Sequence, residues 1–288
     1  MNEYTIITDS ACDIKPELLA KWGVKYVSLT FAFEGSDKEY RNGELASEVF
    51  YKKMRDGAIA KTSAANADTF KNAFAEEVKN GKDVLYLGFS SGLSTTYNSS
   101  RLAAAELSEL YPERKIICVD TLAASAGFGL LLYLALQRKA KGDSIEEVEK
   151  FVMDSRLRIC QWFTVDDLIY LKRGGRISAA TAFVGGVLGI KPVLHVDNEG
   201  HLISALKARG RKASLKALAD KYGVLAVNPE HGTVFISHGD CLEDVNTLKD
   251  MLKTTYGADV KLVTDVGPVI GAHSGPGTVA LFFVGKER

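Results

Sequence analysis

Hydroxyl side chains are concentrated in "LGFSSGLSTTYNSS", residues Leu87–Ser100, where seven of the eleven residues from Ser90 onward are Ser or Thr. The run follows the apolar stretch "VLYLGF" and precedes a pattern typical of an amphipathic helix. A helix beginning there would offer free backbone N–H groups and hydroxyls at one point, which suits an anion. Ser94 is the expected N-cap of this helix, and it could serve only as that cap.

A second pair of hydroxyls, Thr62 and Ser63 in "KTSAAN", precedes a helical pattern over residues 67–79. The pair could likewise only cap a helix, or the two hydroxyl loops could converge if both lie at the carboxyl edge of one sheet. Neither loop contains GxxxxGK(S/T) or GxGxxG, so the sequence does not indicate a phosphate site for ATP or NAD.

His273 lies in "VGPVIGAHSGPG", and the surrounding glycines and prolines predict a tightly shaped turn before the last strand. Such a turn could hold the imidazole in a defined place, or it could leave the ring in water. A serine esterase or acyltransferase could use Ser94 with His273, and Asp9 would be a guess as the third member. The GxSxG elbow of many such enzymes is missing from the sequence.

The stretch "LIYLKRGGRIS" combines an apolar helical pattern with a basic Gly-Gly turn, and "GGVLGIKPVL" follows it. Arg173 and Arg176 are either solvated charges or contacts for a phosphate or an acidic partner. The glycines at 185, 186 and 189 allow close backbone approach. They fit a wall around a slender apolar ligand, and they fit tight helix packing equally well.

The elements that must position these residues change character near residue 157. The first half alternates short apolar runs with helical patterns, which predicts a parallel sheet wrapped by helices. In the second half, "KPVLHVDNEGHLISALKA" predicts an antiparallel hairpin that turns at residues 198–200. We therefore predict an α/β protein of two domains, with a parallel α/β domain over residues 1–156 and a mixed α/β domain over residues 157–288.

The composition favours a soluble protein with balanced charge. The 36 basic and 36 acidic residues cancel, so no strong field for nucleic acid or an anionic membrane is expected. The uncharged segment Thr121–Gln137 is nearly long enough to span a membrane, but its Ala, Gly and Ser content favours a helix buried in the fold. The four cysteines are widely spaced, and the N-terminus does not resemble a signal peptide, so we expect reduced thiols, no metal site and a cytoplasmic location.

Taken together, the motifs "TDSACD", "KTS", "SSGLSTTYNS", "LKRGGRIS", "IKP" and "GPVIGAHSGPG" resemble those of the DegV family of bacterial fatty-acid-binding proteins, in the same order across nearly the whole chain. The resemblance implies a two-domain DegV-like fold with a buried acyl chain. It also implies that Thr62 and Ser94 bind the carboxylate of a long-chain fatty acid such as palmitate, stearate or oleate, with His273 nearby.

The same resemblance implies a carrier rather than an enzyme, with no catalytic residue and no cofactor of its own. Such carriers present the fatty acid to a separate ATP-dependent fatty acid kinase, which makes an acyl phosphate for phospholipid synthesis. Arg176 and Arg209 are the candidates for the surface that meets the kinase. The chain departs from the family at Thr95 and at Ala64-Ala65, which leaves the shape of the entrance open.

Two other functions remain as alternatives at this point, the serine esterase or acyltransferase and a lipid-sensing regulator without a kinase. The preferred acyl length and the oligomeric state also stay open, because they depend on side chains whose positions the sequence does not give. The candidates for the wall of the pocket are Phe89, Leu93, Phe128, Phe183, Val187 and Leu188.

Overall fold

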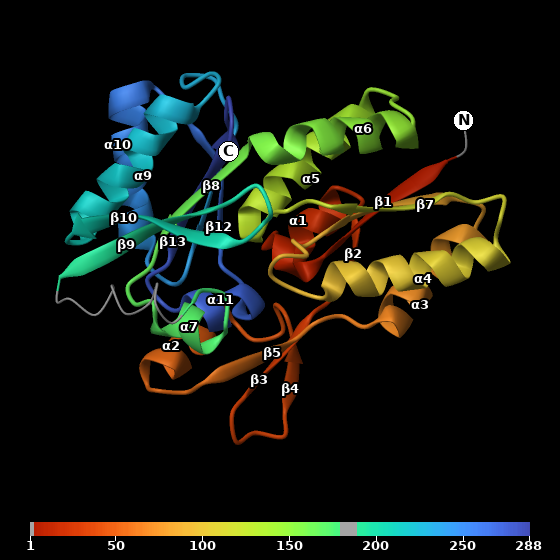
Figure 1. The fold of residues 1–288 in the computed structure, drawn as a ribbon, viewed down its shortest axis with the longest axis horizontal. Coiled ribbons are helices and arrows are strands. Elements are labelled where there is room, and N and C mark those ends of the chain that lie inside the picture. The colour runs from red at the N-terminus through yellow and green to blue at the C-terminus, as the bar shows by residue number, and fades with distance from the viewer. Residues whose placement is uncertain (1–2, 179–188) are drawn as a thin grey trace.

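The computed structural model describes residues 3–178 and 189–288 and arranges them as three β-sheets with helices between and around them (Figure 1). The N-terminal sheet has four parallel strands in the order β2-β1-β6-β7. Its strands are β1 (Tyr4–Asp9), β2 (Lys25–Val27), β6 (Asp83–Gly88) and β7 (Ile116–Asp120). Strands β1 and β6 are buried along their whole length, as expected of a parallel sheet covered on both faces.

Short helices and amphipathic helices surround this sheet. They are η1 (Ser10–Cys12), α1 (Pro16–Lys21), α3 (Ala67–Lys79), α4 (Thr96–Leu110) and α6 (Ile145–Ser155). Helix α6 begins with a complete capping box, in which Ser144 and Glu147 each bond the other's backbone N–H. The predicted parallel α/β arrangement of the N-terminal half is confirmed.

The C-terminal sheet has six strands in the order β10-β9-β8-β13-β11-β12 and is mixed, because only β11 and β12 run parallel. Its strands are β8 (Ile159–Thr164), β9 (Ile190–Val196), β10 (Leu202–Arg209), β11 (Val234–His238), β12 (Val260–Asp265) and β13 (Val279–Val284). Helices α9 (Arg211–Leu225) and α10 (Leu242–Tyr256) pack beside it, and η2 (Arg156–Arg158) leads into β8. The predicted antiparallel hairpin is the β9–β10 pair.

A small third sheet was not predicted. The apolar run over residues 24–33 reads as one strand, but it is divided into β2 and β3 (Thr30–Phe33). The division falls where the Leu29 backbone N–H bonds the Ser10 hydroxyl at 3.0 Å. Strand β3 then pairs antiparallel with β4 (Glu39–Arg41) and β5 (Ala60–Ser63).

Aromatic packing joins this third sheet to the C-terminal half. Phe31 on β3 and Phe50 on α2 (Ser47–Arg55) form one buried cluster with Ala272 on α11 (Pro268–Ser274). The Tyr51 hydroxyl donates to the Val266 carbonyl at 2.7 Å. Figure 1 shows α11 and α7 (Ile169–Arg173) lying between the third sheet and the C-terminal sheet.

Helix α5 (Ser125–Ala140) is the buried helix expected from the uncharged segment, shifted a few residues along the chain. It packs against β8, β11 and β13 of the C-terminal sheet and against η1 of the N-terminal half. Gly127 and Gly129 allow this approach, because a Cβ atom would lie 2.7 Å from Phe282 at the first position and 2.7 Å from Ile14 at the second. Among residues 3–178 and 189–288, no helix is long and apolar enough to cross a membrane.

The largest hydrophobic core is shared by both halves of the chain. It joins Ile6 and Phe128 of the N-terminal half to Phe163, Phe235 and Phe282 of the C-terminal half. The chain passes from the first sheet to the second between β7 and β8, through α5 and α6. A domain boundary at residues 156–157 stays a prediction, since the core continues across it.

Candidate functional site

A cavity of about 420 Å3 lies between the two large sheets and the third sheet. This volume is within the range of about 300–1,000 Å3 that is usual for small-molecule sites. Much of its wall is apolar, with contributions from both halves of the chain. Apolar lining residues include Leu29, Phe89, Phe163, Leu171, Val269 and Phe282.

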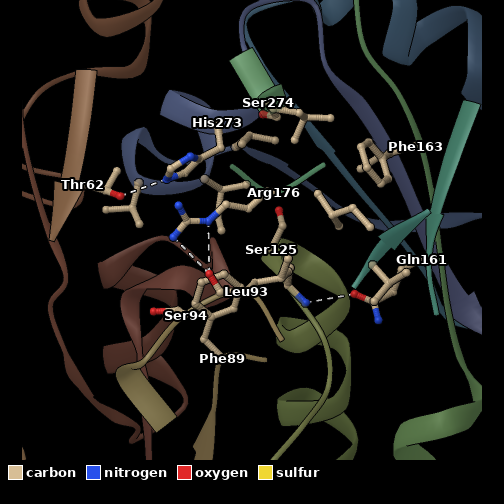
Figure 2. A pocket seen from close by; sticks show the side chains of 18 of the residues that line it. Thr62, Phe89, Leu93, Ser94, Ser125, Gln161, Phe163, Arg176, His273 and Ser274 are labelled. Carbon is tan, nitrogen blue, oxygen red and sulfur yellow. Dashed lines mark hydrogen bonds between the residues drawn. The ribbon is translucent and has the colours of Figure 1, made fainter. Parts of the chain in front are cut away.

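Polar groups gather at one end of this cavity. Thr62 and His273 face each other there, with 2.9 Å between Thr62 Oγ1 and His273 Nε2 (Figure 2). Arg176 lies between them and Leu93, and its guanidinium donates to the Leu93 carbonyl from Nε at 3.2 Å and from Nη2 at 3.1 Å. Ser94 lines the same end of the cavity. Four segments far apart in the chain thus bring Thr62, Ser94, Arg176 and His273 to one place.

The local structure at Thr62 and His273 differs from the sequence-based expectation. Thr62 does not cap a helix, since it lies on β5, and the N-cap of α3 is Asn66. His273 lies on the short helix α11 rather than in the predicted tight turn. Thr62 therefore reaches the cavity from the third sheet, and Ser94 reaches it from the loop after β6 of the N-terminal sheet. The two hydroxyls do not lie along the carboxyl edge of one sheet.

Ser94 precedes the N-cap of α4, which is Thr95, so the predicted cap position is wrong by one residue. The Ser94 hydroxyl still accepts the Thr96 backbone N–H at 3.2 Å and lies 2.9 Å from the Thr96 hydroxyl. When the Thr96 hydroxyl is the donor in this contact, the hydrogen of the Ser94 hydroxyl is left to bond a ligand. Thr95 and Ala64, two of the departures from the family pattern, also line the cavity.

Several of the other hydroxyls in the run after Phe89 have partners within the protein. Ser90 is fully buried and donates to the Gly200 carbonyl at 2.9 Å, and Ser100 donates to the Tyr97 carbonyl at 2.7 Å. The density of hydroxyls in the sequence therefore overstates the number that face the cavity.

Electrostatics at the polar end favour an anion. Burial, and then the nearby Arg176 charge, lower the pKa of His273 to about 4, so the imidazole is neutral near pH 7. Burial also lowers the pKa of Arg176, but an arginine side chain keeps its charge in proteins. Among the described residues that line it, the polar end thus combines one cation, Arg176, with neutral hydrogen-bonding groups.

The geometry does not favour a serine hydrolase. His273 Nε2 contacts Thr62, and no hydrogen bond joins it to Ser94 among the residues the structure describes. A histidine with a pKa near 4 is also a weak base near pH 7. Asp9 cannot complete a triad with His273, because its carboxylate accepts from Ala11, Tyr86 and Phe89 at 3.0, 2.6 and 2.9 Å.

Arg209 is the last residue of β10 and is not among the residues that line the cavity. Its side chain is exposed. Of the predicted wall residues, Phe89 and Leu93 line the cavity, whereas Phe128 is buried in the shared core. Phe183, Val187 and Leu188 lie outside the described residues, as do two of the three glycines at 185, 186 and 189. Within the described ranges, no group of three or more His, Cys, Asp or Glu side chains could hold a metal ion.

Sequence reasoning missed the strand residues of the wall. Gln161 and Phe163 alternate on β8, and Ala280 and Phe282 pair with them on β13. The period of two predicts that each set shares one face of a strand. It does not reveal that this face borders a cavity. Ser125, at the start of α5, lines the same region and was also missed.

Comparisons with known proteins agree with this fold. Residues 3–286 match the model for uncharacterised proteins of the DegV family. A DegV domain-containing protein of Clostridium perfringens is 44% identical over 289 residues, covering 100% of this chain and 99% of the relative.

Solved structures of similar proteins include fatty-acid-binding members. A DegV family protein of Thermus thermophilus, described as binding fatty acid, has a TM-score of 0.88 and 32% identity, covering 99% of this chain and 100% of that one. A stearic-acid-binding protein of Eubacterium ventriosum has a TM-score of 0.88 and 26% identity, covering 98% of each chain. The predicted DegV-like α/β fold is thus confirmed, and the chain belongs to the DegV family.

Proposed function

We propose that the protein binds a long-chain fatty acid, with the tail in the apolar part of the cavity and the carboxylate at Thr62, Ser94 and His273. The observation that carries this proposal is one cavity with a long apolar wall and a single cationic, hydroxyl-rich end. The fatty acids described for the related Thermus thermophilus and Eubacterium ventriosum proteins support the same ligand class.

The energetics suit this ligand. Burial contributes ~0.8 kcal/mol for each CH2, so a C16 chain supplies roughly 11 kcal/mol before the entropy of binding is subtracted. A carboxylate that leaves water needs hydrogen bonds and a counter-charge. Arg176 can supply the charge, and the hydroxyls of Thr62 and Ser94 can supply hydrogen bonds.

The neutral His273 ring can direct the Thr62 hydroxyl. Its Nδ1 atom is buried next to Gly174 and has no hydrogen-bond partner among residues 3–178 and 189–288. A hydrogen on Nδ1 would be left unpaired, so we place the hydrogen on Nε2, which then donates to Thr62 Oγ1. The hydrogen of the Thr62 hydroxyl is then free to bond the ligand carboxylate.

The binding proposal is tested first by native mass spectrometry of the purified protein, with extraction and identification of any bound lipid. The variant Thr62→Ala with Ser94→Ala should bind palmitate about 100-fold more weakly than the wild type, because two hydrogen bonds to a charged group are lost. The matched control is Thr69→Ala with Ser99→Ala, which removes hydroxyls from α3 and α4 outside the cavity. Equal affinity in the two double variants would contradict the proposed head-group site.

We further propose that the protein is a cytoplasmic, non-enzymatic carrier that presents the fatty acid to a separate fatty acid kinase for acyl phosphate formation in phospholipid synthesis. The family resemblance supports this role, and the exposed side chain of Arg209 is suited to a protein contact. Arg176 lines the cavity, so a partner would meet it only at the polar end.

The kinase contact can be separated from ligand binding by charge reversal. Arg209→Glu should lower acyl phosphate formation by the cognate kinase about tenfold while palmitate affinity stays unchanged. Arg176→Glu should weaken both, because it places a negative charge beside the carboxylate. Lys79→Glu, an exposed site at the end of α3, is the control. Full acyl phosphate formation with Arg209→Glu would exclude that surface.

A further inference from the structure

The β9–β10 hairpin forms part of the cavity wall, as well as an edge of the C-terminal sheet. Val196 and Leu202, the residues on either side of its turn, both line the cavity. On the outer side, β10 is an edge strand with few buried residues, and Ile203 and Leu206 are 40% and 41% exposed. Strand β9 is held in the core by the buried Val193 and Leu194, whereas β10 and the turn have little buried surface and open at a lower free-energy cost.

The turn of this hairpin is attached to the rest of the molecule by polar contacts. Ser90 donates its hydroxyl to the Gly200 carbonyl at 2.9 Å, across 110 positions of sequence. Arg288 donates from Nη1 to the carbonyls of Asp197 and Leu122, both at 2.8 Å. We call Ser90 and Arg288 the hairpin anchors. Figure 1 shows the hairpin reaching from the C-terminal sheet towards the N-terminal half.

The fit beneath the turn is close. A Cβ atom on Gly92 would lie 2.9 Å from the carbonyl oxygens of Glu199 and Gly200, and a Cβ atom on Gly200 would collide with the Ser90 hydroxyl. The loop that carries Ser94 therefore lies directly against the turn. A displacement of the turn would open the cavity wall next to the loop that is proposed to hold the carboxylate.

Neither hairpin anchor lines the cavity. Ser90 is fully buried, and the Arg288 guanidinium also donates to Ile159 and Arg156, at 3.2 and 2.6 Å. Both side chains therefore act on a ligand through the backbone segments that they hold. Arg288 holds the hairpin turn, whereas Ser90 holds the turn and also the Ser94 loop, since its hydroxyl accepts the Gly92 N–H at 3.2 Å.

We propose that the turn and the outer strand β10 of the hairpin form a movable wall of the cavity, and that the hairpin anchors are positioning residues that set the rate at which a fatty acid exchanges. This inference rests on the proposed function, since it requires a lipid in the cavity. It assigns Ser90, one of the many hydroxyls in the run after Phe89, to ligand retention rather than to ligand contact.

The test is stopped-flow kinetics with cis-parinaric acid, a fluorescent C18 fatty acid. Ser90→Ala and Arg288→Gln should each raise the association and dissociation rates about fivefold, because one hydrogen bond that closes the wall is lost. The dissociation constant should change less than twofold, since both rates rise together. A loss of head-group contacts would instead weaken affinity through the dissociation rate.

The matched control is Ser100→Ala, which removes another fully buried hydroxyl that bonds a backbone carbonyl, within α4 and outside the cavity. It should leave both rates unchanged. Rates equal to those of the wild type in both anchor variants would overturn the inference, as would faster dissociation with a matching loss of affinity. If Ser90→Ala does not fold, Arg288→Gln decides. A wild-type protein that binds no fatty acid would overturn the proposed function itself.

Discussion

The residues at the polar end of the cavity offer an anion two kinds of interaction, a positive charge and hydrogen bonds. Arg176 supplies the charge, and the hydroxyls of Thr62 and Ser94 offer hydrogen atoms. His273 stays neutral because it is buried beside Arg176. A second cation there would bind the anion more strongly, but it would repel Arg176 and would itself need desolvation.

The neutrality of His273 has a consequence for stability. Its pKa in the folded protein, about 4, lies below the ordinary histidine value, so the unfolded chain takes up this proton first as the pH falls. The free energy of unfolding should therefore decrease as the pH is lowered from about 6.5 to about 4. His273→Gln should remove this part of the decrease in urea titrations, while His231→Gln, at an exposed histidine, should keep it. Parallel curves for the wild type and His273→Gln would contradict the assignment.

At the scale of elements, one buried carboxyl joins three segments near the cavity. Asp13 follows η1 with a left-handed backbone, at φ 51°. It contacts the Ser125 hydroxyl of α5 at 2.5 Å and accepts the Gly267 N–H, just before α11, at 3.0 Å. Its backbone carbonyl accepts from Thr264 of β12 at 2.7 Å. Asp13, the last residue of "TDSACD", therefore connects three segments of the fold.

Burial raises the pKa of Asp13 to about 8, against the opposing effect of its hydrogen bonds. The folded protein therefore keeps this proton between about pH 4 and pH 8, whereas the unfolded chain loses it. The free energy of unfolding should decrease as the pH rises through that range. Asp13→Asn should flatten this dependence, and Asn also tolerates a left-handed backbone. Asp154→Asn, at an exposed site, is the control, and an unchanged slope in Asp13→Asn would refute the prediction.

The whole molecule is held together by contacts between its halves. One core contains residues from both large sheets, α5 packs against both halves, and the third sheet packs on α11. A ligand cavity at such a junction can be built only when both halves are present. The boundary between residues 156 and 157 stays a prediction, because the two halves share this core.

This shared core predicts that the halves do not fold alone. A fragment of residues 1–156 should lack a cooperative thermal transition in circular dichroism, because α5 would expose the surface that packs on β8, β11 and β13. The full chain should unfold in one transition. A fragment that unfolds cooperatively by itself would show that the boundary separates independent domains.

The sequence by itself determined most elements of the fold and the family to which the chain belongs. Helix α3 has the bounds expected from its helical pattern, and the hairpin follows from alternation around a turn. These signals are local, since they depend on neighbouring residues in one element. The family motifs likewise pointed to Thr62, Ser94 and His273 before their positions were known.

Only the tertiary structure decided which of those residues meet and what surrounds them. Thr62 and His273 are 211 positions apart, and their 2.9 Å contact depends on how β5 and α11 pack. The same packing turns Arg176 into the cavity and gives Ser90 to the hairpin rather than to a ligand. No local pattern encodes such contacts, because they arise from the burial of distant surfaces against one another in a shared core.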